Sequence, residues 1–102
     1  MKQIITDMVE AINQRPDNEP LPLLTALSAS QMVYDEKENY IQFKVKGDKG
    51  INKVKVIYDE GADLYNVEFW SIRGLKFNMK DSIQGLFFDT LTQAIWRRVV
   101  IV

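Results

Sequence analysis

Two alternating segments joined by a short acidic turn, within residues 53–72, constrain the fold more than any other part of the chain. Large apolar side chains recur at every second position on both sides of the turn: Val54, Val56 and Tyr58 before it, and Tyr65, Val67 and Phe69 after it. Such alternation is typical of half-buried strands, and a glycine in the connection favours a hairpin. Pairing Tyr58 with Tyr65 places all these side chains on one face, whereas a slip of one residue sets Val56 against Asn66. The segment therefore predicts an antiparallel hairpin with one apolar face.

The other segments extend this hairpin into a mixed fold. The expected elements, in chain order, are a helix over 2–14, strands over 31–34, 40–46, 53–58, 65–72 and 75–80, and a last helix. Prolines at 16, 20 and 22 end the first helix and predict an extended arm, packed through Leu23, Leu24 and Leu27. Short turns between successive strands favour neighbouring pairing. We predict a single α+β domain over residues 1–102, with an antiparallel four- to five-stranded meander sheet, an N-terminal helix and a C-terminal helix.

The sequence allows two starting positions for the last helix. Asp81 and Gln84 have the spacing of a capping box, but Gly85 would then weaken the first turn, which favours a start near Leu86. The stripe of this helix is Phe87, Leu91, Ala94, Ile95 and Arg98, with Phe88 beside it. An apolar tail over 99–102 follows, and the sequence leaves open whether it is a strand; a strand here could dock on an edge of its own sheet or of a second copy.

The composition excludes several classes of chemistry. The chain has no cysteine and no histidine, which removes disulfides, thiolate sites and the commonest general base and metal ligand. No nucleophile–base pair, phosphate-binding glycine loop or metal-ligand spacing is present, so we expect no enzyme activity, no cofactor and no metal. A net charge of −1 predicts no strong overall field for nucleic acid or membrane. With no apolar run of roughly 18 residues and no signal-peptide layout, we expect a cytoplasmic protein.

Carboxylates gather at two predicted turns. Asp59, Glu60 and Asp63 surround Gly61 in the central hairpin, where oxygen ligands and a glycine suit Ca²⁺ or Mg²⁺. Asp35, Glu36 and Glu38 make the same case more weakly. Turns also recruit Asp and Gly for backbone reasons alone, and we favour this solvated interpretation.

A lysine-rich face is predicted on the outer side of the sheet. Its candidate anion-binding residues are Lys44, Lys46, Lys53 and Lys55, with Lys49 nearby. If Phe43 pairs with Val56, then Lys44 faces Lys55 and Lys46 faces Lys53. Tyr40 and Trp70 would supply stacking for a nucleic acid. The alternative, which we favour, is that these lysines solvate the sheet and prevent edge-to-edge aggregation.

Apolar side chains also fall on the face opposite the core. Trp70, Ile72 and Ile57 alternate with the core residues of the central hairpin. Either a helix covers this side, which we favour, or a partner does. With Val100 and Ile101 of the tail, Trp70 and Ile72 are the candidate partner-binding residues.

The order of short motifs resembles a family of small, functionally uncharacterised bacterial and phage-encoded α+β proteins. The matching residues are Met32–Asp35, Gly50–Val54, Asp63–Phe69, Ile72–Gly74 and Gly85–Phe87, followed by Asp89 and Leu91. The chain departs from the Thr-Gly-Leu-like ending of the family, having Trp96–Val99 instead. The resemblance implies a helix-plus-sheet domain in a phage or mobile-element context, and it implies no activity.

These observations predict a small non-enzymatic interaction or oligomerisation module that binds a protein partner or itself, and no membrane. The alternative is a nucleic-acid-binding domain that uses the lysine-rich face. The two differ in salt dependence, because phosphate contacts release counterions.

Overall fold

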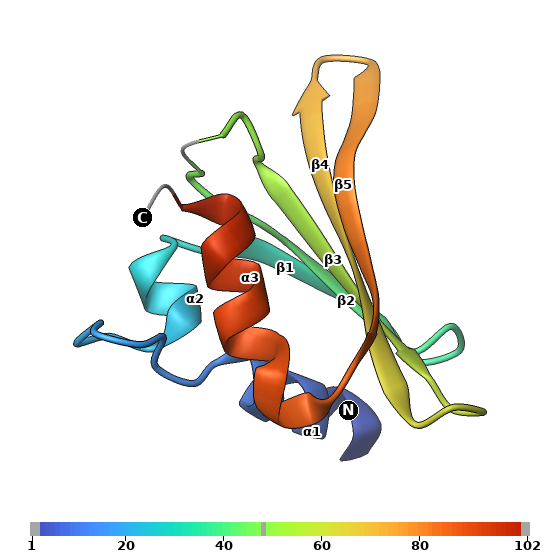
Figure 1. Cartoon of the computed structure of the whole chain (residues 1–102). Helices are drawn as coiled ribbons and strands as arrows, with labels where there is room; N and C mark the ends of the chain where they lie inside the picture. Colours follow the sequence, from blue (N-terminus) through green and yellow to red (C-terminus); the bar gives the residue numbers. More distant parts are fainter. Residues whose placement is uncertain (1–2, 48, 101–102) are drawn as a thin grey trace.

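The computed structural model of the chain describes residues 3–47 and 49–100. Three α-helices and a 3₁₀ turn combine with five strands (Figure 1). In chain order they are α1 (Gln3–Ile12), α2 (Leu23–Ala26), β1 (Ser30–Asp35), β2 (Tyr40–Lys44), β3 (Lys53–Asp59), β4 (Leu64–Arg73), β5 (Lys76–Leu86), the 3₁₀ turn η1 (Phe88–Thr90) and α3 (Leu91–Val99).

The strands form one antiparallel sheet in the order β1-β2-β3-β4-β5. This meander, with α1 before it and α3 after it, confirms the predicted α+β fold. All three helices lie on the same side of the sheet, so they leave its other face open (Figure 1). The hairpin of β4 and β5 projects beyond the ends of the other strands (Figure 1).

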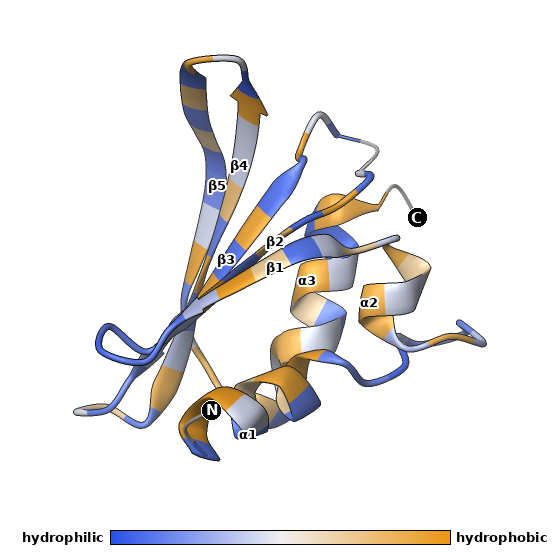
Figure 2. Ribbon diagram, turned by 180° about the vertical axis from the view of Figure 1, so that it is seen from behind, coloured by the Kyte–Doolittle hydropathy of each residue, from blue (hydrophilic) through white to orange (hydrophobic). Residues whose placement is uncertain are grey.

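The core forms between the helices and the inner face of the sheet. Alternation places every second side chain of β3 and β4 in this core, and the hydropathy of the strands alternates accordingly (Figure 2). Fully buried side chains from the sheet and the helices form one cluster; its largest members are Phe43, Phe69, Ile5, Met8, Ile12, Leu23, Leu27, Ile41, Leu91 and Ile95.

The predicted register of the central hairpin is confirmed, with Tyr58 opposite Tyr65. The predicted register of the preceding pair is wrong by two residues. Phe43 pairs with Val54, so Lys44 faces Lys53, and Lys46 lies beyond the end of β2. Both registers keep the apolar side chains on the inner face, so the alternation could not distinguish between them.

The last strand is longer than predicted, and the last helix begins later. Residues 81–86 continue β5 along β4 as far as the pair Leu86–Tyr65, so neither Asp81 nor Leu86 starts a helix. Gly85 has a φ of 73°, which accommodates an irregularity in this strand. The first helical turn is the 3₁₀ turn η1, and Phe87 and Phe88 are exposed rather than part of a buried stripe.

The arm after the prolines is not fully extended, because it includes the one-turn helix α2. Leu23 and Leu27 bury their side chains in the core, as predicted. The end of α1 is held against α3 by Thr92, whose hydroxyl donates to the carbonyl of Ile12 at 2.6 Å. This contact joins the end of α1 to the start of α3.

Both edges of the sheet are irregular. On β1 the register shifts between Ser30 and Val33, and Gln31 between them has a φ of 50°. On β5 the pairing with β4 shifts twice, next to Phe69 and next to Tyr65. Each edge strand is therefore interrupted by bulges.

Candidate functional site

An apolar patch lies on the outer face of the sheet at the base of the projecting hairpin. It consists of Trp70, Ile72, Phe77 and Met79, and we call it the outer patch. Trp70 pairs with Met79 and Ile72 with Phe77, so the four side chains share one face. Phe77 is 61% exposed and Met79 52% exposed, while Trp70 and Ile72 are half-buried. None of the described helices covers this face, so the prediction of a covering helix is wrong.

Basic side chains border the outer patch. Lys44 and Lys53 face one another across β2 and β3, and Lys53 in turn faces Trp70. Lys53, Lys55, Trp70 and Phe77 help to line a shallow cavity of about 300 Å³. Lys46 is exposed beyond the strand, at the end of the sheet. Three of the four predicted lysines therefore lie on the outer face.

Two of these outer-face residues already have partners. The ammonium group of Lys55 lies 4.2 Å from the centre of the Tyr40 ring, and Lys55 faces Glu68 across the strands. The indole nitrogen of Trp70 donates to a Glu68 carboxylate oxygen at 3.1 Å. Glu68 thus neutralises part of the positive charge of the lysines on this face, because opposite charges at facing positions of two strands attract.

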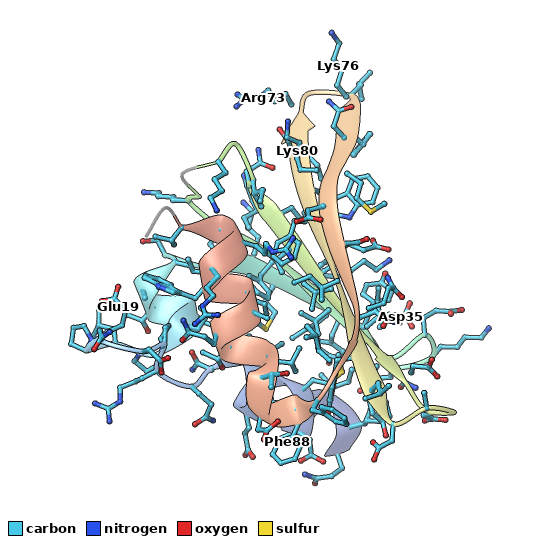
Figure 3. All side chains as sticks on the ribbon, viewed as in Figure 1. Glu19, Asp35, Arg73, Lys76, Lys80 and Phe88 are labelled. Atoms are coloured by element: carbon cyan, nitrogen blue, oxygen red, sulfur yellow. The ribbon has the colours of Figure 1, made fainter. Side chains whose placement is uncertain are left out.

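The tip of the β4–β5 hairpin carries an exposed leucine between basic residues. Leu75 is 94% exposed, and it lies between Arg73 and Lys76, which pair across the turn. Arg73, Lys76 and Lys80 all lie on the projecting hairpin (Figure 3). We call residues 73–77 the finger. Within the described part of the chain, Arg73 and Lys76 have no anionic partner.

Asn52 fixes the base of the finger. Its side chain donates to the carbonyl of Ile72 and accepts from the Ile72 amide, each at 2.8 Å. The side chain thereby extends the pairing with β4 just before β3 begins, because the first residue of β3, Lys53, pairs with Trp70. Beyond Ile72 the hairpin is two strands wide and free on its outer face.

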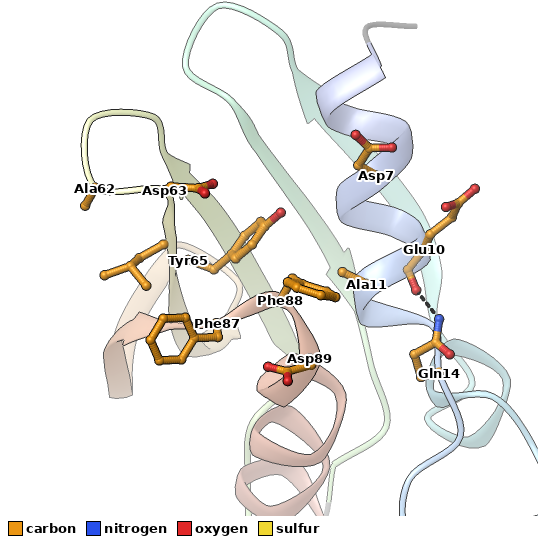
Figure 4. Close-up of a pocket in the computed structure, with 11 residues that line it drawn as sticks. Asp7, Glu10, Ala11, Gln14, Ala62, Asp63, Tyr65, Phe87, Phe88 and Asp89 are labelled. Carbon is orange, nitrogen blue, oxygen red and sulfur yellow. Dashed lines mark hydrogen bonds between the residues drawn. The ribbon is translucent and has the colours of Figure 1, made fainter.

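The second candidate surface is a groove at the opposite end of the sheet. It has a volume of about 1000 Å³ and lies between α1, the β3–β4 turn and the segment that enters α3 (Figure 4). Its carboxylates come from Asp7, Glu10, Asp63 and Asp89, and its apolar walls include Leu64, Tyr65, Phe87 and Phe88. Phe88 lies between Tyr65 and Ala11, whereas Phe87 points to the other side (Figure 4). We call this the acidic groove.

The electrostatics of the acidic groove favour a cation. Asp7 accepts from Gln3 at 2.7 Å and Asp63 from Tyr58 at 2.6 Å. The carboxylates of Glu10 and Asp89 have no cationic or hydrogen-bonding partner among residues 3–47 and 49–100. Burial first, and then the charges of Asp63 and Asp7, raise the pKa of Tyr65. Two carboxylates beside exposed phenyl rings can receive an ammonium or guanidinium group.

Basic and acidic side chains gather at opposite ends of the molecule. Antiparallel order brings the β2–β3 loop and the finger to one end, and α3 ends there too, since Lys49 donates to the carbonyl of Arg97. The basic residues at this end are Lys44, Lys46, Lys49, Lys53, Arg73, Lys76, Arg97 and Arg98, of which Arg98 forms an ion pair with Asp81. The acidic groove and the turns that carry Asp35, Glu36, Glu38, Asp59 and Glu60 lie at the other end. The small net charge of the sequence conceals this separation.

The carboxylates of the acidic turn all accept hydrogen bonds from nearby groups. Asp59 accepts from the amide of Ala62, Glu60 from the side chain of Asn39, and Asp63 from Tyr58. The hydrogen bond to Asp63 is the main cause that raises the pKa of Tyr58 to about 12. In the described residues, no three carboxylates are arranged to hold a metal ion.

The first two residues of the apolar tail do not form a strand of the sheet. Val99 is the last residue of α3 and is fully buried, and the half-buried Val100 follows it in extended conformation. Ile101, the other predicted tail contact, lies outside the described residues. Burial of Val99 against Gly47 ties the helix to the β2–β3 loop, so this residue contributes to the core and is not a free surface.

Sequence reasoning identified the outer patch in part and missed the finger and the acidic groove. The sequence predicts Trp70 and Ile72 as partner-binding residues, whereas for their neighbours Phe77 and Met79 it predicts only a strand. Phe87 and Phe88 match a helical stripe in the sequence but are exposed in the structure, so this pattern carries no signal for the groove. None of the helices in the described ranges is long and apolar enough to cross a membrane.

Comparison of the chain with protein-family models, with curated proteins and with solved structures found no match.

Proposed function

We propose that this chain is a small, non-enzymatic protein-interaction module that associates with itself through the outer patch and the finger. The observation that carries the proposal is the uncovered apolar surface around Phe77. Monomeric proteins rarely leave aromatic and aliphatic side chains together on a projecting element, and such patches often mark interaction sites.

The surroundings of the outer patch support a protein partner. Aromatic and methionine side chains at the centre of a surface, with charged residues at its rim, resemble the composition of protein interfaces. The rim here is basic, through Lys53, Arg73 and Lys76. The partner surface is therefore expected to be apolar at its centre and acidic at its rim.

Sedimentation velocity tests the proposal. The wild-type chain is expected to show mass increasing with concentration between about 10 µM and about 1 mM, since a small interface binds weakly. Phe77→Ser combined with Met79→Ser should abolish the increase, because both side chains are exposed and belong to the outer patch. The matched control is Val33→Ser, an equally exposed residue on the outer face at the opposite edge of the sheet, which should associate like the wild type. A wild-type chain that stays monomeric over this range would contradict the proposal.

A second candidate function is the binding of single-stranded nucleic acid to the same face. The cavity that joins Lys53 and Lys55 to Trp70 favours it, because bases stack on aromatic rings while lysines contact phosphates. Fluorescence anisotropy with labelled oligonucleotides should then show binding whose salt dependence becomes shallower by about one unit for each lysine replaced by glutamate. Absence of binding at low salt up to tens of micromolar protein, about the middle of the range for non-specific binding, would exclude this candidate.

A further inference from the structure

We propose that the finger of one copy inserts into the acidic groove of another copy, so that the chain assembles head to tail. This inference rests on the proposed function and adds the surface that receives the finger. Leu75 would pack against the exposed ring of Phe88, and Arg73 and Lys76 would pair with the carboxylates of the groove.

The two surfaces are complementary in charge and in apolar character. The finger presents an almost fully exposed leucine between two cations that have no anionic partner in the described structure. The groove presents phenyl rings beside Glu10 and Asp89, whose carboxylates lack a cation within that same part of the chain. The finger therefore supplies cations and the groove supplies carboxylates. Opposite charges across a contact speed the encounter of two proteins and fix its orientation.

The geometry requires the contact to be intermolecular. β4 runs from Leu64 in the wall of the groove to Arg73 in the finger, over ten residues. At about 3.3 Å per residue this separates the two surfaces by about 30 Å. Figure 3 shows Arg73 and Lys76 at one end of the molecule and Phe88 at the other. A finger can therefore reach only the groove of a neighbour.

Because finger and groove are different surfaces, the contact is heterologous. Each copy that has inserted its finger still offers an empty groove, so the assembly grows unless it closes into a ring. The smallest closed form is a pair in which each finger occupies the groove of the other copy. Contact between two outer patches, by comparison, would stop at a dimer and would bring like charges together.

Charge reversal of each surface tests the inference with the full chain. The finger variant carries Arg73→Glu and Lys76→Glu, and the groove variant carries Glu10→Lys and Asp89→Lys; all four side chains are exposed. Each variant alone should associate at least about tenfold more weakly than the wild type in sedimentation velocity. An equimolar mixture should regain association, because every finger then meets a groove of opposite charge in the other variant.

Two controls complete the experiment. Lys37→Glu, an exposed reversal in the β1–β2 turn, should leave the association of the wild type unchanged. Raising the salt concentration should weaken the wild-type association, because exposed ion pairs are screened. Circular dichroism of each variant should match the wild type, which separates a lost contact from a lost fold.

The outcomes distinguish this inference from the function on which it rests. If the groove variant associates as strongly as the wild type while the Phe77→Ser and Met79→Ser variant does not, the groove is not the receiving surface and the outer patch remains the contact. A mixture that fails to regain association also overturns the inference. If the wild type itself is monomeric, both proposals are wrong.

Discussion

Replacement of Phe69 by alanine is expected to lower the free energy of unfolding by about 3–5 kcal/mol, whereas the same change at Phe77 should lower it by less than about 1 kcal/mol. The two phenylalanines lie on adjacent strands, β4 and β5. Phe69 is fully buried at the centre of the core, and Phe77 is 61% exposed. The first substitution removes transfer free energy and leaves a cavity; the second removes a ring that is mostly in water.

Thermal unfolding followed by circular dichroism measures both variants. A loss of 3 kcal/mol should lower the Tm of a domain of this size by about 12 °C or more. Since small domains are stable by only about 5–15 kcal/mol, the Phe69→Ala variant is expected to be partly unfolded in mild denaturant. Equal losses for the two variants would show that the inner and outer faces have been assigned wrongly.

Replacement of Gly47 by alanine is expected to destabilise the fold by about 1–3 kcal/mol or more, through overpacking. A Cβ atom at this position would lie 2.4 Å from the carbonyl oxygen of Ile51 and 2.9 Å from a methyl group of Val99. The Ile51 carbonyl belongs to the β2–β3 loop, which also carries Asn52. A shift of this carbonyl would therefore move Asn52 and the base of the finger that Asn52 holds. The β2–β3 loop and the end of α3 would therefore separate.

Gly61→Ala is the matched control for this substitution. A Cβ atom there would meet only the Asp59 carboxylate, at an ordinary contact distance of 3.5 Å, and Gly61 does not have a positive φ. Alanine at this site should be neutral or stabilising by about 0.4–1 kcal/mol, because it restricts the unfolded chain. Urea unfolding of both variants checks the pair. A Gly47→Ala variant as stable as Gly61→Ala would rule out the close approach of the loop to α3.

The sequence predicted most where one physical constraint had a single solution. Strict alternation and a short turn fixed the pairing of Tyr58 with Tyr65, since any odd slip exposes the apolar side chains. For β2 and β3 the constraint had two solutions. Pairing Phe43 with Val54 or with Val56 keeps the same residues buried, and the choice depends on how the β2–β3 loop closes through Asn52 and Gly47. Alternation carries no information on that closure.

The boundary between β5 and α3 shows a second limit of sequence reasoning. Asp81 and Gln84 have helix-start spacing, yet pairing along β4 keeps residues 81–86 in the sheet as far as Leu86. Tertiary pairing therefore overrides the local signal. The acidic groove lay beyond prediction for the same reason, since its walls combine Asp7 and Asp89, which are far apart in the chain. Its position depends on where α3 begins.

The bulges on the two edge strands restrict how copies of this chain can meet. A regular edge strand offers a row of free amides and carbonyls on which a neighbour can add its own strand, and continuous sheets and fibrils grow in this way. Here β1 is interrupted at Gln31, and β5 is interrupted opposite Phe69 and Tyr65. Strand addition at either side would leave backbone groups unmatched at each interruption. At high concentration, copies of the chain therefore do not join their sheets through backbone hydrogen bonds. Any contact between them is made by side chains and is reversible.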